Sequence, residues 1–253
     1  MMYIPGQMQV TLVSCYGQKT QPMIDLIRFC QNELSKGLLA AFRPYELEQV
    51  HATLVGLEGY RQQDKIINRN FLERRHEKRE MNLAAAIAFS QSDSLPSMTI
   101  RIGGYQPEVD YGFTSQGQHP YLRSFSVHGE IAVAMGWPVA GNTVLDRLRR
   151  HFNTMNIWHK RHDTDVDVDN DFYFVLGCID RRFVTDEHVT AVEGNLRQML
   201  AATEPMRFEI DRSSLSIVGY LDKQLPLATS CAFPVDGLEI DVALLRALYP
   251  EEL

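Results

Sequence analysis

Residues 49–59 constrain the fold of this chain more than any other stretch of it. They read Gln-Val-His-Ala-Thr-Leu-Val-Gly-Leu-Glu-Gly, a short run of β-branched and apolar residues that ends at glycine, as strands do. Alternate side chains of a strand share a face, so His51 and Thr53 point the same way. The opposite face is apolar throughout and must pack on a core. The first face therefore carries an imidazole and a hydroxyl two residues apart, close enough to act on one small group.

The rest of the chain alternates between helical and extended patterns. Apolar spacing predicts helices, which lie at residues 20–36, 142–153 (with Asn142 as a possible N-cap), 186–202 and 241–248. Alternating or continuous apolar runs predict strands, which lie at residues 8–16, 98–103, 124–136, 171–177, 208–210, 214–220 and 231–235. Residues 60–82 are dense in charge and are predicted to be a solvated helix that extends to about residue 89. The alternative is that their basic side chains form a lip that steers a phosphate-bearing ligand.

A coarse internal echo predicts how these elements assemble. The helix at 20–36 is followed by the His51 strand, and the helix at 142–153 is followed by a strand that contains Tyr173 and also ends in glycine. We therefore expect an α+β fold with two pseudo-symmetric lobes of mainly antiparallel sheet, outer helices and a central groove. No linker separates the halves, so residues 1–253 are predicted to be a single bilobal domain. Lobe one would span about 8–103, with a charged helical insertion at 60–90, and lobe two about 124–235.

Composition narrows the functional classes. The 253 residues carry a formal net charge of -7, which argues against a protein that coats DNA, although not against a local basic groove. The four cysteines lie far apart without metal-ligand spacing, as in an intracellular protein with reduced thiols. No stretch has the pattern of a signal peptide or the length of a membrane span. We expect a cytoplasmic protein that has no membrane association.

The tripeptide His51-Ala52-Thr53, with the Leu-Val-Gly that follows it, resembles the first motif of the two-histidine (2H) phosphoesterase superfamily. That family includes 2′,3′-cyclic phosphodiesterases and RNA 2′-5′ ligase-like proteins. The order of the later elements also fits, so the resemblance spans most of residues 8–235. It implies two His-x-Ser/Thr motifs, one per lobe, that face a central groove. It also implies a nucleotide or RNA-end phosphate as ligand and no cofactor, with His51, Thr53 and Tyr173 as the catalytic positions.

The second motif departs from the family pattern. Tyr173 stands where the second histidine belongs, and Val175 stands where the second hydroxyl belongs. Histidine, with an unperturbed pKa of ~6.5, exchanges protons near neutral pH, whereas tyrosine at ~10 is a poor base there. The sequence therefore predicts a phosphate-binding protein with weak or altered phosphodiesterase activity. The alternative is a catalytically inactive member of the fold that regulates or binds a protein partner.

Two further features could contribute to a site. His128, in the strand at 124–136, is the best replacement for the missing histidine and is predicted to bind the phosphate ligand, although a strand histidine is more often structural. Residues 159–171 contain five alternating aspartates after His159 and His162. Carboxylates are ligands of Ca²⁺ or Mg²⁺, which makes a metal-dependent hydrolase the second alternative. The spacing fails the EF-hand template, so we predict an exposed acidic loop and no metal ligand.

Overall fold

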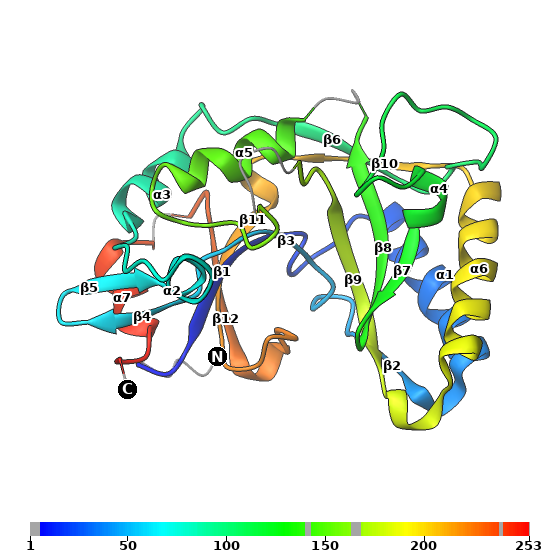
Figure 1. The fold of residues 1–253 in the computed structure, drawn as a ribbon, viewed down its shortest axis with the longest axis horizontal. Coiled ribbons are helices and arrows are strands. Elements are labelled where there is room, and N and C mark those ends of the chain that lie inside the picture. Colours follow the sequence, from blue (N-terminus) through cyan, green and yellow to red (C-terminus); the bar gives the residue numbers. More distant parts are fainter. Residues whose placement is uncertain (1–5, 140–142, 163–167, 238–239, 253) are drawn as a thin grey trace.

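A computed structural model describes residues 6–139, 143–162, 168–237 and 240–252, which form a mixed α+β fold around two antiparallel sheets (Figure 1). The first sheet has the strand order β12-β11-β1-β3, with β1 at Gln9–Ser14, β3 at Ala52–Gly56, β11 at Leu215–Tyr220 and β12 at Ser230–Pro234. The second sheet has the order β10-β6-β8-β9-β2, with β2 at Phe42–Pro44, β6 at Met98–Ile102, β8 at Ile131–Pro138, β9 at Phe172–Ile179 and β10 at Met206–Ile210. A further strand, β7 at Phe125–His128, also pairs with β8.

Helices cover the outer sides of the two sheets. Helix α1 (Gln21–Leu38) packs beside α6 (Asp186–Ala202) on the second sheet, while α3 (Leu83–Gln91), α5 (Val144–Asn153) and α7 (Val242–Leu248) accompany the first sheet (Figure 1). The remaining helical turns are α2 (Arg69–Arg75), α4 (Pro120–Arg123), η1 (Leu39–Ala41), η2 (Arg181–Phe183), η3 (Arg212–Ser214) and η4 (Leu227–Thr229). None of the described helices is long and apolar enough to cross a membrane.

The chain crosses between the two sheets more than once. Strands β2 and β6 come from the first half of the sequence but pair in the second sheet, and β11 and β12 come from the second half but pair in the first. The lobes therefore do not follow the expected division into residues 8–103 and 124–235. The reason is long-range pairing: β1 and β9 each find antiparallel partners on both sides from distant parts of the chain. One hydrophobic cluster extends through both sheets and includes residues from both halves.

The predicted elements are largely confirmed, with two corrections. The helices at 20–36 and 186–202 appear as α1 and α6, and Asn142 lies outside the described residues. Residues 60–82 were expected to be helical, but they open with a hairpin of β4 (Gly59–Gln62) and β5 (Lys65–Asn68), which buries Ile66 and Ile67. Only the short α2 and a separate α3 are helical in this region.

The second correction concerns residues 124–136, which form the hairpin β7–β8 rather than one strand. Gly129 stands at the first turn position with a φ of 62°. A positive φ there is what a two-residue hairpin turn requires, and glycine adopts it without steric cost. The turn places Ser126 and His128 on a strand beside β8, two strands away from Tyr173 and Val175.

Candidate functional site

His51 lies at the point where the two sheets meet. It directly precedes β3, and its carbonyl oxygen accepts a hydrogen bond of 3.0 Å from the backbone N–H of Val175 in β9. The two strands that carry the predicted motif positions are therefore neighbours, as the internal echo suggested. Figure 1 shows β3 and β9 side by side at the centre of the molecule.

The imidazole of His51 is held in one tautomer. Its Nδ1 is 2.7 Å from the carbonyl oxygen of Gln49, and a carbonyl can only accept, so Nδ1 carries the proton. The neutral ring then has its lone pair on Nε2. Burial lowers the pKa of His51 to about 4, because the charged form is disfavoured away from water. At neutral pH the ring is therefore an uncharged acceptor or base. His51 lines a cavity between the two sheets, and Thr53, which is half-buried two residues further along the chain, lines the same cavity.

The side chains of β9 alternate between the cavity and the core, as the sequence predicted. Tyr173 and Val175 are half-buried and line the cavity, whereas Phe172 and Phe174 are buried on the opposite face. The hydroxyl of Tyr173 donates to Oδ2 of Asp171 at 3.3 Å and accepts from Nε2 of Gln116 at 2.9 Å. Burial, and then the Asp171 carboxylate, raise the pKa of Tyr173 above its ordinary value. The phenol is thus neither a base nor an uncommitted donor at neutral pH.

His128 lines the same cavity from β7. Its Nε2 is 3.1 Å from Oγ of Ser126, and its ring centroid is 5.6 Å from that of Tyr173. Burial, and then the guanidinium groups of Arg123 and Arg161, lower the pKa of His128 to about 4. The cavity therefore has one neutral imidazole from each sheet, His51 and His128, and the imidazole of His159 also lines it.

The cavity itself has a volume of about 610 Å³ and is lined by residues of both sheets. Its cationic side chains include Lys160, Arg161 and Lys223, and its acidic ones are Glu58 and Glu130. The guanidinium of Arg161 lies 4.6 Å from the ring centroid of Tyr173, a stacking that holds its in-plane donors in place. Lys160 and Arg161 also line a neighbouring cavity of about 870 Å³, so a ligand could extend from one cavity into the other.

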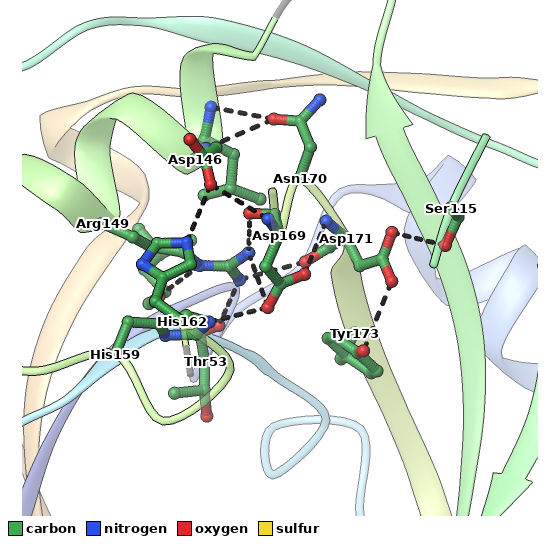
Figure 2. Close-up of polar contacts among 12 residues, drawn as sticks. Thr53, Ser115, Asp146, Arg149, His159, His162, Asp169, Asn170, Asp171 and Tyr173 are labelled. Carbon is green, nitrogen blue, oxygen red and sulfur yellow. Dashed lines mark hydrogen bonds and ion pairs between the residues drawn. The ribbon is translucent and has the colours of Figure 1, made fainter. Parts of the chain in front are cut away.

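Arg149 joins the two sheets and also lines this cavity, and sequence patterns alone did not identify it. It lies on α5, is 1% exposed, and donates to the carbonyl oxygens of Leu54 at 2.9 Å, Asp169 at 2.8 Å and Asp171 at 3.0 Å (Figure 2). Its guanidinium therefore ties the backbone of β3 to the segment that leads into β9. The sequence does hold a signal for it, because Arg149 falls on the apolar stripe of the helix, four residues after Leu145.

The aspartate-rich segment is not the exposed loop that was expected, at least where it is described. Asp169 is buried and accepts from Nε2 of His159 at 2.7 Å, with Nη1 of Arg149 at 3.4 Å. Burial favours the neutral acid, yet Arg149 and His159 together hold the pKa of Asp169 below its ordinary range. The repulsion expected among these carboxylates is thus relieved by cations and hydrogen bonds. Residues 163, 165 and 167, the other three aspartates, lie outside the described residues.

The side chains of Asp171 and His162 are likewise held by hydrogen bonds to neighbouring side chains. The carboxylate of Asp171 accepts from Oγ of Ser115 at 2.7 Å, Nε1 of Trp137 at 2.7 Å and Nη2 of Arg123 at 3.1 Å. Figure 2 shows His162 directed at Asp146, with Nε2 and Oδ1 separated by 2.8 Å. Within the described part of the chain, no group of three or more His, Cys, Asp or Glu side chains could hold a metal ion. These residues connect structural elements to each other.

Comparisons with known proteins add little to this geometry. No protein-family model matches the chain, and no curated protein matches it. Among solved structures it is similar to the protein TT0787 of Thermus thermophilus, with 12% sequence identity and a TM-score of 0.43. That similarity covers 92% of this chain and 100% of the other. A likeness this weak supports no functional argument, so the site must be judged by its own residues.

Proposed function

We propose that the protein binds a nucleotide or an RNA end through its phosphate, in the 610 Å³ cavity between the two sheets. One observation carries the proposal: His51, Thr53, His128 and Tyr173, chosen from sequence alone, line a single cavity together with cationic side chains. The acidic protein as a whole repels polyanions, so the cationic lining residues Lys160, Arg161 and Lys223 are what would attract one to this cavity.

Each side chain has a part suited to a phosphate ester. The cations neutralise the charge of the phosphate oxygens, and the hydroxyl of Thr53 can donate to one of them. Nε2 of His51 accepts a hydrogen bond from a ribose hydroxyl or from a water at the phosphate. The neutral imidazole of His128 faces the cavity from the other sheet and provides a second acceptor or donor.

Turnover is expected to be weak. Hydrolysis of a phosphodiester at neutral pH needs a base for the attacking oxygen and an acid for the leaving oxygen. His51 can serve as the base, but His51 and His128 are both neutral at that pH because their pKa values are lowered to about 4. The third cavity histidine, His159, is neutral as well, and its Nε2 is bound to Asp169. The hydroxyl proton of Tyr173 is donated to Asp171, and Val175 has no polar group. The cavity is therefore better suited to bind a phosphate than to cleave its ester.

A thermal-shift screen tests the proposal. The panel would contain 2′,3′-cyclic nucleotides, nucleoside monophosphates and short RNAs that end in a 2′ or 3′ phosphate. A ligand present at 100 times its Kd stabilises the folded protein by about 2.7 kcal/mol, which is readily seen as a rise in Tm. We expect such a rise for the native protein and its loss in His51→Ala. No shift with any phosphate compound would overturn the proposal and leave the protein-partner alternative.

An activity assay on the ligands that bind follows directly. We expect at most slow cleavage of the cyclic phosphates, and that residual rate should fall further in His51→Ala. Equal residual rates in the two proteins would exclude His51 as the base.

A further inference from the structure

The lining of the proposed phosphate cavity includes a carboxylate that no phosphate would contact, that of Glu58. Glu58 lies in the link between β3 and β4, and its side chain folds back over Gly56, the last residue of β3. A Cβ atom placed on Gly56 would be 2.0 Å from Oε2 of Glu58. The carboxylate therefore occupies the space that a side chain at position 56 would fill.

A bulge in β3 brings this carboxylate to the strand face that carries Thr53. In the pairing of β3 with β1, Leu54 is the extra residue without a partner. A bulge shifts the alternation of side chains by one position, so Gly56 rather than Val55 lines the cavity with Thr53. Three residues of strand separate Thr53 from Gly56, which is a span of at most about 10 Å. A nucleotide can reach across it, with its phosphate near Thr53 and the edge of its base at Glu58.

The carboxylate of Glu58 is held in position but has no cationic partner. Its Oε1 accepts a hydrogen bond of 3.2 Å from the hydroxyl of Tyr220, which is buried and lines the same cavity. No Lys, Arg or His among the described residues forms an ion pair with Glu58. The guanidinium of Arg69, on the neighbouring helix α2, is bound to Glu73 at 2.7 Å. Because a carboxylate has about four lone-pair sites, Glu58 can accept further hydrogen bonds through both of its oxygens.

Asn70 adds a carbonyl oxygen to the same part of the lining. The backbone N–H of Arg69 donates to the carbonyl oxygen of Glu58 at 2.9 Å, so the first turn of α2, which contains Asn70, begins next to Glu58. Asn70 is half-buried and lines the cavity, and its Nδ2 donates to the carbonyl oxygen of Trp158 at 3.1 Å. Its Oδ1 accepts no hydrogen bond from the described residues. Glu58 and Asn70 thus present three acceptor oxygens to a ligand.

A set of acceptor oxygens requires a ligand edge that carries donors. Proteins identify unstacked RNA bases by hydrogen bonds to their Watson–Crick edges. Guanine alone among the four RNA bases has adjacent N1–H and N2–H donors on that edge. Adenine and cytosine combine an amino group with a ring nitrogen that accepts, and uracil has one N–H between two carbonyls. In each of those three bases, a carboxylate would face at least one acceptor, which it repels.

We propose that the ligand of this cavity is a guanine nucleotide, or an RNA end whose last base is guanine, and that Glu58 selects it by accepting from N1–H and N2–H. This inference rests on the proposed function, because it names the base that accompanies the phosphate. The hydrogen bonds are charge-assisted, and the Tyr220 hydroxyl holds the carboxylate in place before the ligand arrives. One such bidentate contact should favour guanine about tenfold or more over the other bases.

Isothermal titration calorimetry with the four nucleoside 3′-monophosphates tests the proposal. We expect 3′-GMP to bind about tenfold or more tightly than 3′-AMP, 3′-CMP and 3′-UMP. Inosine 3′-monophosphate, which lacks the 2-amino group, should bind with intermediate affinity. Equal affinities for all five compounds would overturn the selection of guanine and leave the phosphate site standing. No binding by any of them would overturn the proposed function together with this inference.

Gly56→Ala is the decisive variant, because it keeps every charge of the cavity. The added Cβ meets the flexible end of Glu58, so the carboxylate has to move while the strand stays as it is. The preference for 3′-GMP should disappear in Gly56→Ala and in Glu58→Gln, and both proteins should still bind 3′-AMP, which shows that they are folded.

Glu130→Gln is the matched control. Glu130 also lines the cavity, but it is exposed in the turn between β7 and β8. Removing its charge should change the affinities for the four nucleotides by the same factor. A preference for 3′-GMP that persists in Gly56→Ala and Glu58→Gln, or one that is lost in Glu130→Gln, would overturn the assignment to Glu58.

Discussion

Replacing Arg149 by methionine should destabilise the whole protein, because this residue joins the two lobes. Methionine keeps the apolar stem and suits a helix, but it removes the donors to the carbonyls of Leu54, Asp169 and Asp171. It also leaves the Asp169 carboxylate buried without its guanidinium partner. Removing one partner of a buried ion pair costs about 3–5 kcal/mol, a large part of a typical unfolding free energy of about 5–15 kcal/mol.

Urea denaturation followed by circular dichroism measures this loss. With an m-value of about 3 kcal/mol/M, the midpoint should fall by more than about 1 M. Arg147→Met is the matched control, since Arg147 is on the same helix but exposed, and its midpoint should change by much less. Equal and small changes in the two variants would refute the reasoning that Arg149 holds β3 against the segment before β9.

The geometry of the site makes two more predictions. In the folded protein the pKa of His51 is lowered to about 4 and that of His159 to about 3. Between those values and the unfolded pKa of ~6.5, the unfolded state binds more protons than the folded state. The free energy of unfolding therefore falls as the pH falls through this range. Each histidine should lower the free energy of unfolding by about 1 kcal/mol between pH 6.5 and 5.5. This loss is measured as a drop in the urea midpoint, and the drop should be smaller in His51→Gln. A midpoint that stays constant over this range would contradict the burial of neutral rings. Tyr173→Phe removes the hydrogen bonds that its hydroxyl makes with Asp171 and Gln116, so it should lower the free energy of unfolding by about 1–2 kcal/mol. The Kd for a phosphate ligand should stay unchanged, because the hydroxyl proton is already donated to Asp171. A large loss of affinity by calorimetry would show that the phenol contacts the ligand.

Local patterns in the sequence were enough to predict the elements that frame the site. The alternation around His51 and around Tyr173 predicted which side chains share a face, because the other face of each strand is apolar and must be buried, and His51, Thr53 and Tyr173 do line one cavity. The apolar spacing in residues 186–202 likewise matched α6. In these stretches the local preference and the tertiary environment agree.

The rest depended on contacts between distant residues. Nothing local indicates that α1 packs on the second sheet, or that β11 pairs with β1 across about two hundred residues. The hairpin of β4 and β5 was wrongly predicted to be helical, because its only adjacent pair of large apolar residues, Ile66 and Ile67, lies within a mostly charged and polar stretch. The roles of Asp169 and Asp171 were missed for a related reason: a carboxylate can be buried only where a cation or donors meet it, and Arg149 and Arg123 come from other elements.

The central claim is that one phosphate is held between the two sheets by residues of both. Isothermal titration of the best ligand from the thermal-shift screen into the native protein, His51→Ala and His128→Ala tests it most directly. His51 belongs to the junction of β3 and His128 to β7, and both line the same cavity. We expect each variant to weaken binding about tenfold or more, while the urea midpoints show that both remain folded. Unchanged affinity in both variants would contradict the claim.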